Sequence, residues 1–114
     1  MPYYLGAPFW SFAEWKGLFY EPKARPADFL EQYASVFNTV EAGSIFYANP
    51  KAESVKKWRS QVPDDFRFVF KIPKLITHKL KLQDCQKELA EFLKLMEPVH
   101  EVTGMFQIQL SPTF

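Results

Sequence analysis

The feature that most constrains the fold of this chain is a regular alternation of strand-like and helix-like segments. Runs rich in β-branched and aromatic residues predict strands at residues 3–6, 39–42, 67–72 and 105–110. A helix-like run follows each of the first three. Strands that alternate with helices pair in parallel through right-handed crossovers. The order therefore predicts an α/β fold with about four parallel strands and three helices, in a single domain over residues 1–114.

The three expected helices are marked by proline, by capping residues and by apolar residues at helical spacing. Pro26 opens the first helix, Asn49 and Pro50 open the second, and Asp84 caps the third. The apolar positions that would face a core are Phe29, Leu30, Tyr33 and Phe37, then Ala52, Val55, Trp58 and Val62, then Leu89, Phe92, Leu93 and Met96. Residues 74–81 are expected to form a basic loop.

Side-chain alternation along the expected strands divides the sheet into two faces. Phe68 and Phe70 point one way while Lys71 points the other, and Val40 opposes Glu41 in the same manner. One face is therefore apolar and suited to lie beneath helices. The polar residues of the other face are Glu41, Lys71, Gln107 and Gln109. They gather toward the C-terminal ends of the strands, where α/β proteins bind ligands.

Three titratable residues near the strand ends are candidates for catalysis. Glu41 and Lys71 would face the same way from neighbouring strands about 4.8 Å apart. They could form an acid/base or substrate-orienting pair, or an ion pair that only satisfies two charges. His78 follows the third strand, and histidine transfers protons near neutral pH, although a lone loop histidine is also common as a solvated residue.

Aromatic residues make up 18% of the chain, which is a high share, and they cluster in the first loop and after the second strand. The candidates for ligand contact are Trp10, Trp15, Phe19, Tyr20, Phe46 and Tyr47. Such rings can stack on a sugar or a base. The alternative is that they pack against one another and close one end of the fold.

Several classes of function are disfavoured by composition. A net charge of +1 argues against a dedicated nucleic-acid or membrane-surface protein. The single cysteine, Cys85, cannot form an internal disulfide, which fits a reducing cytoplasm. No signal peptide, membrane-spanning run, glycine-rich phosphate loop or zinc-ligand set is recognisable, so no cofactor or metal is expected.

A local basic stripe keeps a second class of function open. It consists of Lys71, Lys74, Lys79 and Lys81, with His78 among them. Such a stripe could attract a phosphate or a nucleic-acid backbone, in which case binding would be sensitive to salt. The alternative is a solvated loop.

Four motifs together resemble the YecE-like family, a domain-of-unknown-function family with a TIM-barrel-type fold. They are GAPFWSFAEWKGLFYEP, FNTVEAGSIFY, FRFVFKIPKLITH and FQIQLSPTF. The resemblance implies a polar pocket at the strand ends, with unassigned activity. The matching positions are Trp10, Trp15, Gly17, Phe19, Tyr20, Glu41, Phe46, Tyr47, Lys71, Thr77, His78 and Gln109. Ala7, Pro8 and Phe9 replace small polar residues of the family's first loop, and Ser111 stands where a proline is usual.

Chain length separates this sequence from the family pattern. A closed barrel needs eight strands and about 250 residues. The chain therefore resembles the N-terminal half of such a barrel, with open sheet edges that favour self-association. For a complete barrel we expect acid/base or hydrolytic chemistry on a small polar or anionic substrate, with Glu41 as acid or base, Lys71 as its partner, His78 as proton shuttle and Gln109 as orienting group. The alternatives are a nucleic-acid or nucleotide binding module and an inactive half-barrel.

Overall fold

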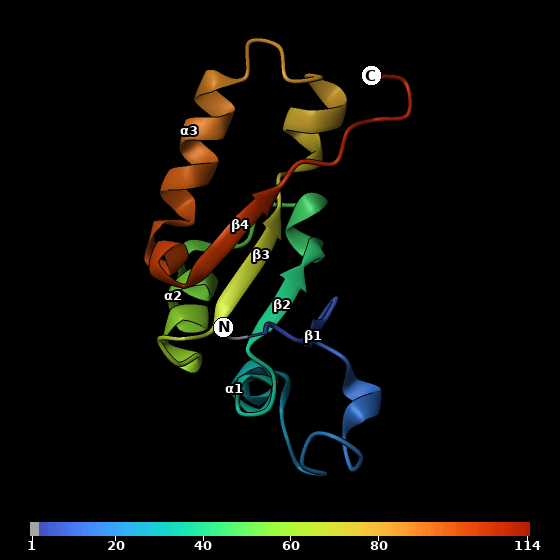
Figure 1. The fold of residues 1–114 in the computed structure, drawn as a ribbon, viewed down its shortest axis with the longest axis vertical. Helices are drawn as coiled ribbons and strands as arrows, with labels where there is room; N and C mark the ends of the chain where they lie inside the picture. The colour runs from blue at the N-terminus through green and yellow to red at the C-terminus, as the bar shows by residue number, and fades with distance from the viewer. Residues whose placement is uncertain (1–2) are drawn as a thin grey trace.

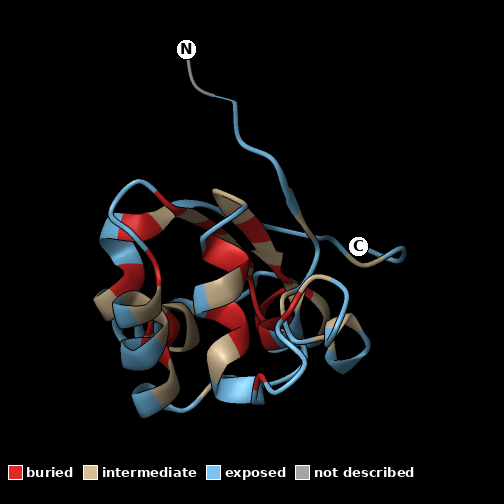
Figure 2. Ribbon diagram, turned by 90° about the horizontal axis from the view of Figure 1, so that it is seen from below, coloured by how far each residue is buried: buried red, intermediate tan, exposed pale blue. Residues whose placement is uncertain are grey.

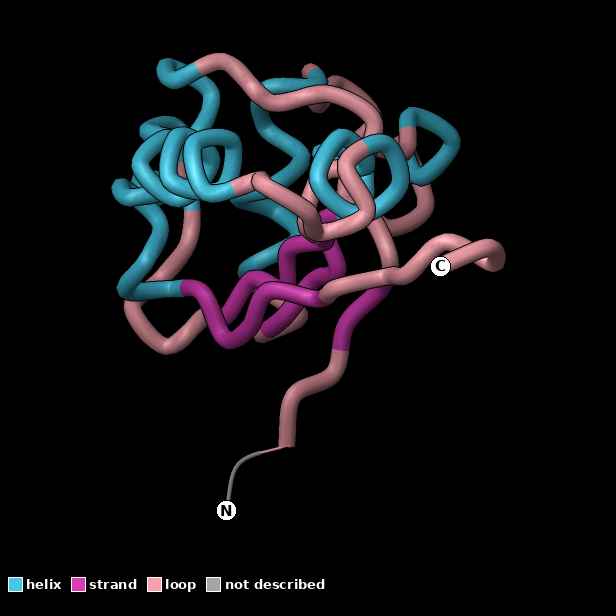
Figure 3. The backbone as a smooth tube through the Cα atoms, turned by 90° about the horizontal axis from the view of Figure 1, so that it is seen from above, coloured by secondary structure: helices cyan, strands magenta, loops and turns pink. Residues whose placement is uncertain are grey.

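The computed structural model describes residues 3–114. The four strands within this range form one sheet. The strands are β1 (Gly6–Ala7), β2 (Thr39–Ala42), β3 (Arg67–Lys71) and β4 (Thr103–Gln107). Their order in the sheet is the order in the chain, and every neighbouring pair is parallel (Figure 1). The helices lie on one side of this sheet (Figure 3). The predicted partial α/β barrel, with parallel strands alternating with helices, is confirmed.

The three helices occupy the predicted regions but begin later than their predicted caps. They are α1 (Phe29–Ala34), α2 (Ala52–Gln61) and α3 (Gln86–Leu95). A 3₁₀ turn, Pro26–Asp28, precedes α1. Lys51 rather than Asn49 occupies the N-cap position of α2. Asp84 does not cap α3, because it has a φ of 46° and Cys85 occupies the N-cap position instead.

The segment after β3 is a π-helical turn, Leu75–Lys79, where the sequence predicted a basic loop. The Pro73 carbonyl accepts hydrogen bonds from the Ile76 and Thr77 amides, at 3.0 and 3.3 Å. This wide turn buries Ile76 and Thr77, while Lys79 and the preceding Lys74 remain exposed to solvent. Burial of an apolar side chain inside the basic run explains why the segment is ordered.

The core lies between the sheet and the helices. Val40 is 1% exposed, and Phe68 and Phe70 are both 0% exposed. They pack in one cluster with residues of the helices, including Val55 of α2 and Phe92 of α3. Figure 2 shows the buried positions concentrated in this layer. The predicted alternation of buried and accessible residues is confirmed along β2 and β3.

The residues just before the edge strand β1 are held by the Asn38 side chain, which precedes β2. The Asn38 side chain accepts a hydrogen bond from the Leu5 amide at 2.8 Å and donates one to the Tyr3 carbonyl at 2.7 Å. Because Asn38 takes the place of a neighbouring strand, the ladder starts only at Gly6 and not at Tyr3 as predicted. A Cβ atom on Gly6 would lie 1.8 Å from the Thr39 carbonyl oxygen, so this close approach requires glycine.

The last strand is also displaced from its prediction, which was residues 105–110. The β3–β4 pairing runs from Phe68 and Thr103 to Lys71 and Gln107. Since β3 ends at Lys71 and Pro73 follows, residues after Gln107 have no neighbouring strand to pair with.

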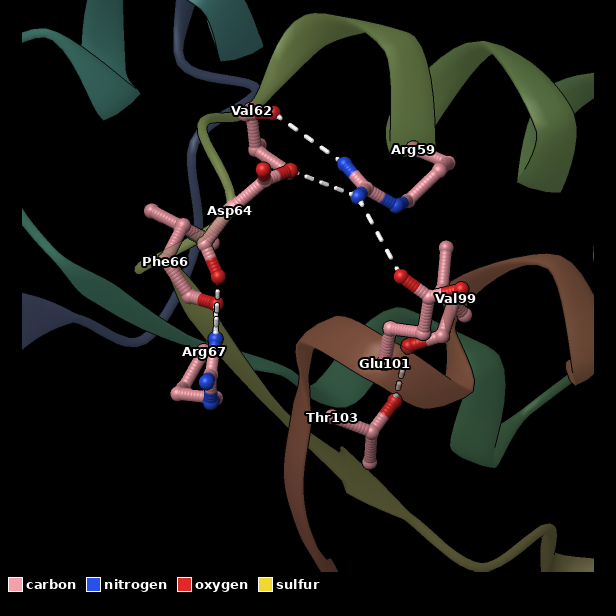
Figure 4. A network of polar contacts seen from close by, with 8 residues as sticks. All are labelled: Arg59, Val62, Asp64, Phe66, Arg67, Val99, Glu101 and Thr103. Atoms are coloured by element: carbon pink, nitrogen blue, oxygen red, sulfur yellow. Dashed lines mark hydrogen bonds and ion pairs between the residues drawn. The ribbon is translucent and has the colours of Figure 1, made fainter.

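A polar network at the N-terminal ends of the strands joins α2 to the connections before β3 and β4 (Figure 4). Arg59 Nη2 lies 2.8 Å from Asp64 Oδ1 and 3.6 Å from Glu101 Oε2. The hydrogen bond that Arg59 donates to the Asp64 carboxylate raises the pKa of the Arg59 guanidinium further above its usual range. Arg67 donates to the carbonyl oxygens of Asp64 and Phe66. This network lies opposite the strand ends that bear Glu41 and Lys71.

The face of the sheet away from the helices is uncovered. Met105 of β4 is 59% exposed, and Tyr4 at the other edge is 51% exposed. In residues 3–114 no helix is both long enough and apolar enough to cross a membrane.

Candidate functional site

Glu41 and Lys71 meet on the uncovered face of the sheet, at the C-terminal ends of β2 and β3. Alternation places both side chains on this face. Lys71 Nζ lies 4.0 Å from Glu41 Oε1. In the ladder Lys71 is also paired with Gln107 of β4, whose side chain is exposed. Three neighbouring strands thus contribute an acid, a base and an amide to one patch.

Phe46 links this ion pair to the histidine. It belongs to a 3₁₀ turn, Gly43–Phe46, that directly follows β2. The Lys71 ammonium lies over the Phe46 ring, 5.3 Å from its centroid, which is a cation–π contact. The His78 ring meets the same phenyl ring at 84°, with centroids 5.2 Å apart. Lys71 and His78 therefore both contact the Phe46 ring, and Glu41 is linked to them through its ion pair with Lys71.

Thr77 sets the position of the His78 ring. Its hydroxyl lies 2.8 Å from His78 Nδ1, and the threonine itself is fully buried in the π-helical turn. A hydrogen bond at Nδ1 leaves Nε2 as the ring nitrogen available to a ligand. Because Thr77 is fully buried, its hydroxyl contacts His78 and not the solvent, and its direct contact with a ligand stays a prediction.

The ion pair is only partly shielded from water. The side chain of Lys71 is 19% exposed and that of Glu41 is 44% exposed. A pair this accessible contributes about 0–1 kcal/mol to stability. The arrangement is therefore not explained by a large gain in folding free energy, and both groups remain accessible to a ligand.

A shallow hollow of about 480 Å³ extends from Glu41 across the uncovered face. Its lining residues are Tyr4, Leu5, Gly6, Ala7, Pro8, Thr39, Val40, Glu41, Val69, Met105 and Gln107. Lys71 and His78 are not among these residues, and the hollow meets Lys71 at Glu41, its ion-pair partner. The border of the hollow at Pro8, Glu41 and Gln107 lies at the C-terminal strand ends, where α/β proteins hold ligands, and from there it extends back to Thr39 at the start of β2.

A larger recess, of about 630 Å³, lies between α2 and α3 on the helical side. It is lined by Ala52, Lys56, Glu91, Lys94, Leu95, Glu97 and Pro98. None of these residues follows a strand, and neither histidine borders the recess. We therefore place the candidate site at the strand ends, where titratable groups converge, and not in the larger recess.

The aromatic residues of the first loop are engaged in packing. Trp10 is half-buried against Trp58 and Phe68, with centroids 5.4 and 6.0 Å away. Tyr20 is 2% exposed, and its hydroxyl donates to the Trp10 carbonyl at 2.5 Å. Burial raises the pKa of the Tyr20 phenol, with a further contribution from nearby Tyr33. Direct ligand contact by Trp10 and Tyr20 stays a prediction, and these contacts favour the packing alternative.

Trp15, Tyr47 and Gln109 complete the set predicted from the sequence. Trp15 is half-buried among aromatic rings of its own loop. Tyr47 is 78% exposed and meets Phe46 edge-on at 5.1 Å. Gln109 lies beyond the end of β4 and is exposed, so the polar amide of the patch that lies within the sheet is Gln107.

Phe9 and Gly43 border the strand ends but were not predicted as site residues. They line a recess of about 160 Å³ with Pro8, Trp10, Ser11, Ala42 and Ser44. The sequence feature that could have identified this recess is Gly43, which directly follows the strand that contains Glu41 and precedes Ser44. Among the described residues there is no group of three or more His, Cys, Asp or Glu side chains placed to hold a metal ion.

Comparison with known proteins identifies relatives over almost the whole chain. The family model described as "Protein of unknown function DUF72" matches residues 4–114. The "UPF0759 protein YecE" of Escherichia coli K12 is 41% identical over 111 residues. That match covers 97% of this chain but 38% of YecE. The chain therefore spans well under half the length of the curated relative it matches.

Solved structures agree with this relationship. A DUF72 family protein, TM1631 of Thermotoga maritima, superposes with a TM-score of 0.76 at 31% identity, covering 95% of this chain and 44% of that protein. Another, EF0366 of Enterococcus faecalis, gives 0.73 at 30% identity, covering 97% of this chain and 40% of that protein. The predicted family resemblance is thus confirmed by sequence and by fold. This chain belongs to the DUF72 family of proteins of unknown function.

Proposed function

We propose that the strand-end patch binds a small polar or anionic substrate and supports acid/base or hydrolytic chemistry on it. The observation that carries this proposal is that Lys71 and His78 contact the same Phe46 ring while Glu41 pairs with Lys71. Titratable groups that gather at the ends of parallel strands are typical of catalytic sites.

Each residue has a distinct role in this proposal. Glu41 is the acid or base, because its carboxylate is the more accessible member of the ion pair. Lys71 provides the positive charge for a substrate anion and is held in place by the Phe46 ring. His78 transfers a proton through Nε2, since Thr77 occupies Nδ1. Gln107 joins the originally predicted Gln109 as a group that could orient the substrate.

The charge balance of the patch favours an anion over a neutral substrate. Lys74, Lys79 and Lys81 are exposed on or beside the π-helical turn. Glu41 is the carboxylate that the structure places against Lys71 at this end of the sheet. Glu88 and Glu91 of α3 border the adjoining recess at Phe46, so the positive charge that favours an anion is that of Lys71 and these exposed lysines on the side of the π-helical turn. The lone half-buried cysteine, Cys85, is consistent with a cytoplasmic location, which remains part of the proposal.

Inorganic phosphate is a suitable probe for this site. We expect calorimetric titration to show binding that Lys71→Met weakens by about tenfold, because one charge-assisted contact is lost. Glu41→Gln is expected to strengthen phosphate binding severalfold, because the competing carboxylate beside Lys71 loses its charge. Lys94→Met, on α3 and away from the strand ends, is the matched control. Equal affinity in the wild type, Lys71→Met and Lys94→Met would contradict the proposal.

Nucleotide or nucleic-acid binding is the second candidate, because Lys74, Lys79 and Lys81 are all exposed at this end of the sheet. It makes a different prediction. Affinity for a short single-stranded oligonucleotide would fall steeply with salt, and Lys74→Gln with Lys79→Gln would reduce the salt dependence. The small-substrate proposal instead expects those two substitutions to change phosphate affinity less than Lys71→Met does.

A further inference from the structure

The 160 Å³ recess at the ends of β1 and β2 is a second feature of this rim that the proposed chemistry does not use. Its walls come from two places: Pro8, Phe9, Trp10 and Ser11 of the loop after β1, and Ala42, Gly43 and Ser44 at the end of β2. Because loops that follow parallel strands lie at the ligand-binding end of such sheets, the position is suited to substrate contact.

Phe9 provides an aromatic surface at this recess. Its ring stacks on Trp15, with centroids 5.5 Å apart and planes at 28°, and meets Phe12 edge-on at 5.2 Å. These contacts hold the ring in place, yet Phe9 is still 41% exposed. A large aromatic side chain that is fixed by its neighbours and still accessible is a rigid surface on which another ring can stack.

Gly43 keeps the opposite wall open. A Cβ atom built at this position would meet no heavy atom within 4 Å, so the space in front of Gly43 is empty and close packing does not require glycine there. The recess volume is similar to that of a cavity of about 150 Å³ that accommodates one benzene ring. The recess, whose lining includes Phe9 and Gly43, is therefore large enough for one six-membered ring, with Ser11 and Ser44 at its border.

The recess adjoins the charged patch. Glu41 immediately precedes Ala42 of the recess wall, and Pro8 borders both the recess and the hollow that contains Glu41. Neighbouring strands are about 4.8 Å apart, so the ends of β1 and β3 are separated by about 10 Å. A small molecule can therefore reach from the recess to Lys71 across the end of β2.

We propose that this recess is a subsite for a ring, and that the natural ligand is a ring-bearing anion whose ring stacks on Phe9 while its charged group contacts Lys71. The anionic half of this inference rests on the proposed function, whereas the ring subsite depends only on the recess. An aromatic ring and the apolar face of a sugar ring share the required chemistry.

Three probes separate the parts of this inference: inorganic phosphate, phenyl phosphate and glucose 6-phosphate. We expect phenyl phosphate or glucose 6-phosphate, whichever carries the matching ring, to bind about tenfold more tightly than inorganic phosphate, because the ring adds a stacked apolar contact. Backbone amide shifts in ¹⁵N NMR spectra should then move at Gly43 and Ser44 with that probe and not with phosphate alone.

Two substitutions test the recess itself. Gly43→Val fills the open space and is expected to reduce the advantage of the ring-bearing probe to within about twofold of phosphate, while phosphate affinity is retained. Phe9→Leu keeps the wall apolar but removes the stacking surface, so it should lose part of the advantage. Ala90→Val, at an exposed position of α3, introduces the same β-branched side chain outside the recess and serves as control. Thermal melts confirm that each variant folds.

The outcomes distinguish this inference from the proposed function. If neither ring-bearing probe binds more tightly than phosphate, or if Gly43→Val and Phe9→Leu both keep the full advantage, the ring subsite is wrong while the anion site can stand. If Lys71→Met leaves phosphate affinity unchanged but Gly43→Val removes ring binding, the proposed function fails and the ring subsite stands.

Discussion

The two faces of the sheet contrast in what their side chains do. On the helical face, Val40, Phe68 and Phe70 are almost completely buried in a continuous aromatic and aliphatic core. On the other face, Glu41 and Lys71 alternate with those residues along the same strands but remain accessible. Neighbouring residues of one strand thus have opposite environments.

This contrast separates stability from chemistry. Burial of apolar area is the main contribution to folding free energy, and here it is concentrated on the helical face. The uncovered face contributes little burial, so its polar residues can be arranged for a ligand at low cost to the fold. Substitutions on the two faces should therefore have different consequences, which the following experiments measure.

The largest expected effect is on the helical face. Phe68→Ala removes a fully buried ring that stacks on Phe70 and meets Phe66 edge-on, and it should lower the free energy of unfolding by about 3–5 kcal/mol. Met105→Ala, on the uncovered face, should lower it by less than about 1 kcal/mol. Urea unfolding followed by circular dichroism gives both values. If Phe68→Ala unfolds the chain completely, Phe68→Leu provides a measurable intermediate. Equal losses for the two faces would contradict the contrast.

The next largest effect on stability is expected for the contacts that hold the edge strand β1. Tyr33 of α1 is fully buried, and its hydroxyl donates to the Thr39 carbonyl at 2.7 Å and accepts from the Ala7 amide at 2.6 Å. Tyr33→Phe leaves these two backbone groups without that partner and should cost about 1–3 kcal/mol in urea unfolding. Hydrogen exchange should increase at Ala7 more than in β3. An unchanged exchange rate at Ala7 would show that β1 is held by other contacts.

Alkaline pH should lower the stability of the fold through the buried residues Tyr20 and Tyr33. Burial raises the pKa of the Tyr20 and Tyr33 phenols above the ordinary value of about 10. The folded state therefore binds more protons than the unfolded state above pH 10, so stability is fully present below that pH and falls as the pH rises through the folded-state values. Melting temperatures from pH 8 to 11 should show this decline. Tyr20→Phe should reduce it, with the exposed Tyr47→Phe as control; equal declines in both variants would contradict the assignment.

The smallest stability effect is expected at the candidate site. Lys71→Met retains an unbranched apolar side chain beside Phe46 and removes only a partly exposed ion pair, so the free energy of unfolding should change by about 0–1 kcal/mol. Phosphate affinity should nevertheless fall about tenfold. A loss of stability as large as that of Phe68→Ala would mean that Lys71 is part of the core and not of a site.

Much of this architecture could be predicted from the sequence, because strand positions and side-chain alternation depend on patterns among neighbouring residues. Residues 39–42 form β2 as predicted, and the alternation in β3 correctly assigned Phe68 and Lys71 to opposite faces. The misplaced elements depend on non-local contacts. The start of β1 depends on the Asn38 side chain, and the end of β4 depends on where its neighbour stops.

The candidate site was predictable in part for the same reason. Strand-end position identified Glu41 and Lys71, and their approach follows from the parallel register. The role of Phe46 beneath the Lys71 ammonium could not be predicted, because it depends on the 3₁₀ turn after β2. The hydrogen bond of Thr77 to His78 depends equally on the π-helical turn, which the sequence presented as a basic loop.

The most direct test of the proposed site is a ¹⁵N NMR map of phosphate binding to the wild-type chain. Two locations compete, the strand-end patch and the larger recess between α2 and α3. We predict that phosphate shifts the backbone amide resonances of Lys71, Phe46 and His78 in a saturable manner, and that Lys71→Met removes these shifts. Saturable shifts confined to the border of the α2–α3 recess, such as those of Lys56 and Lys94, would contradict the assignment of the site to the strand ends.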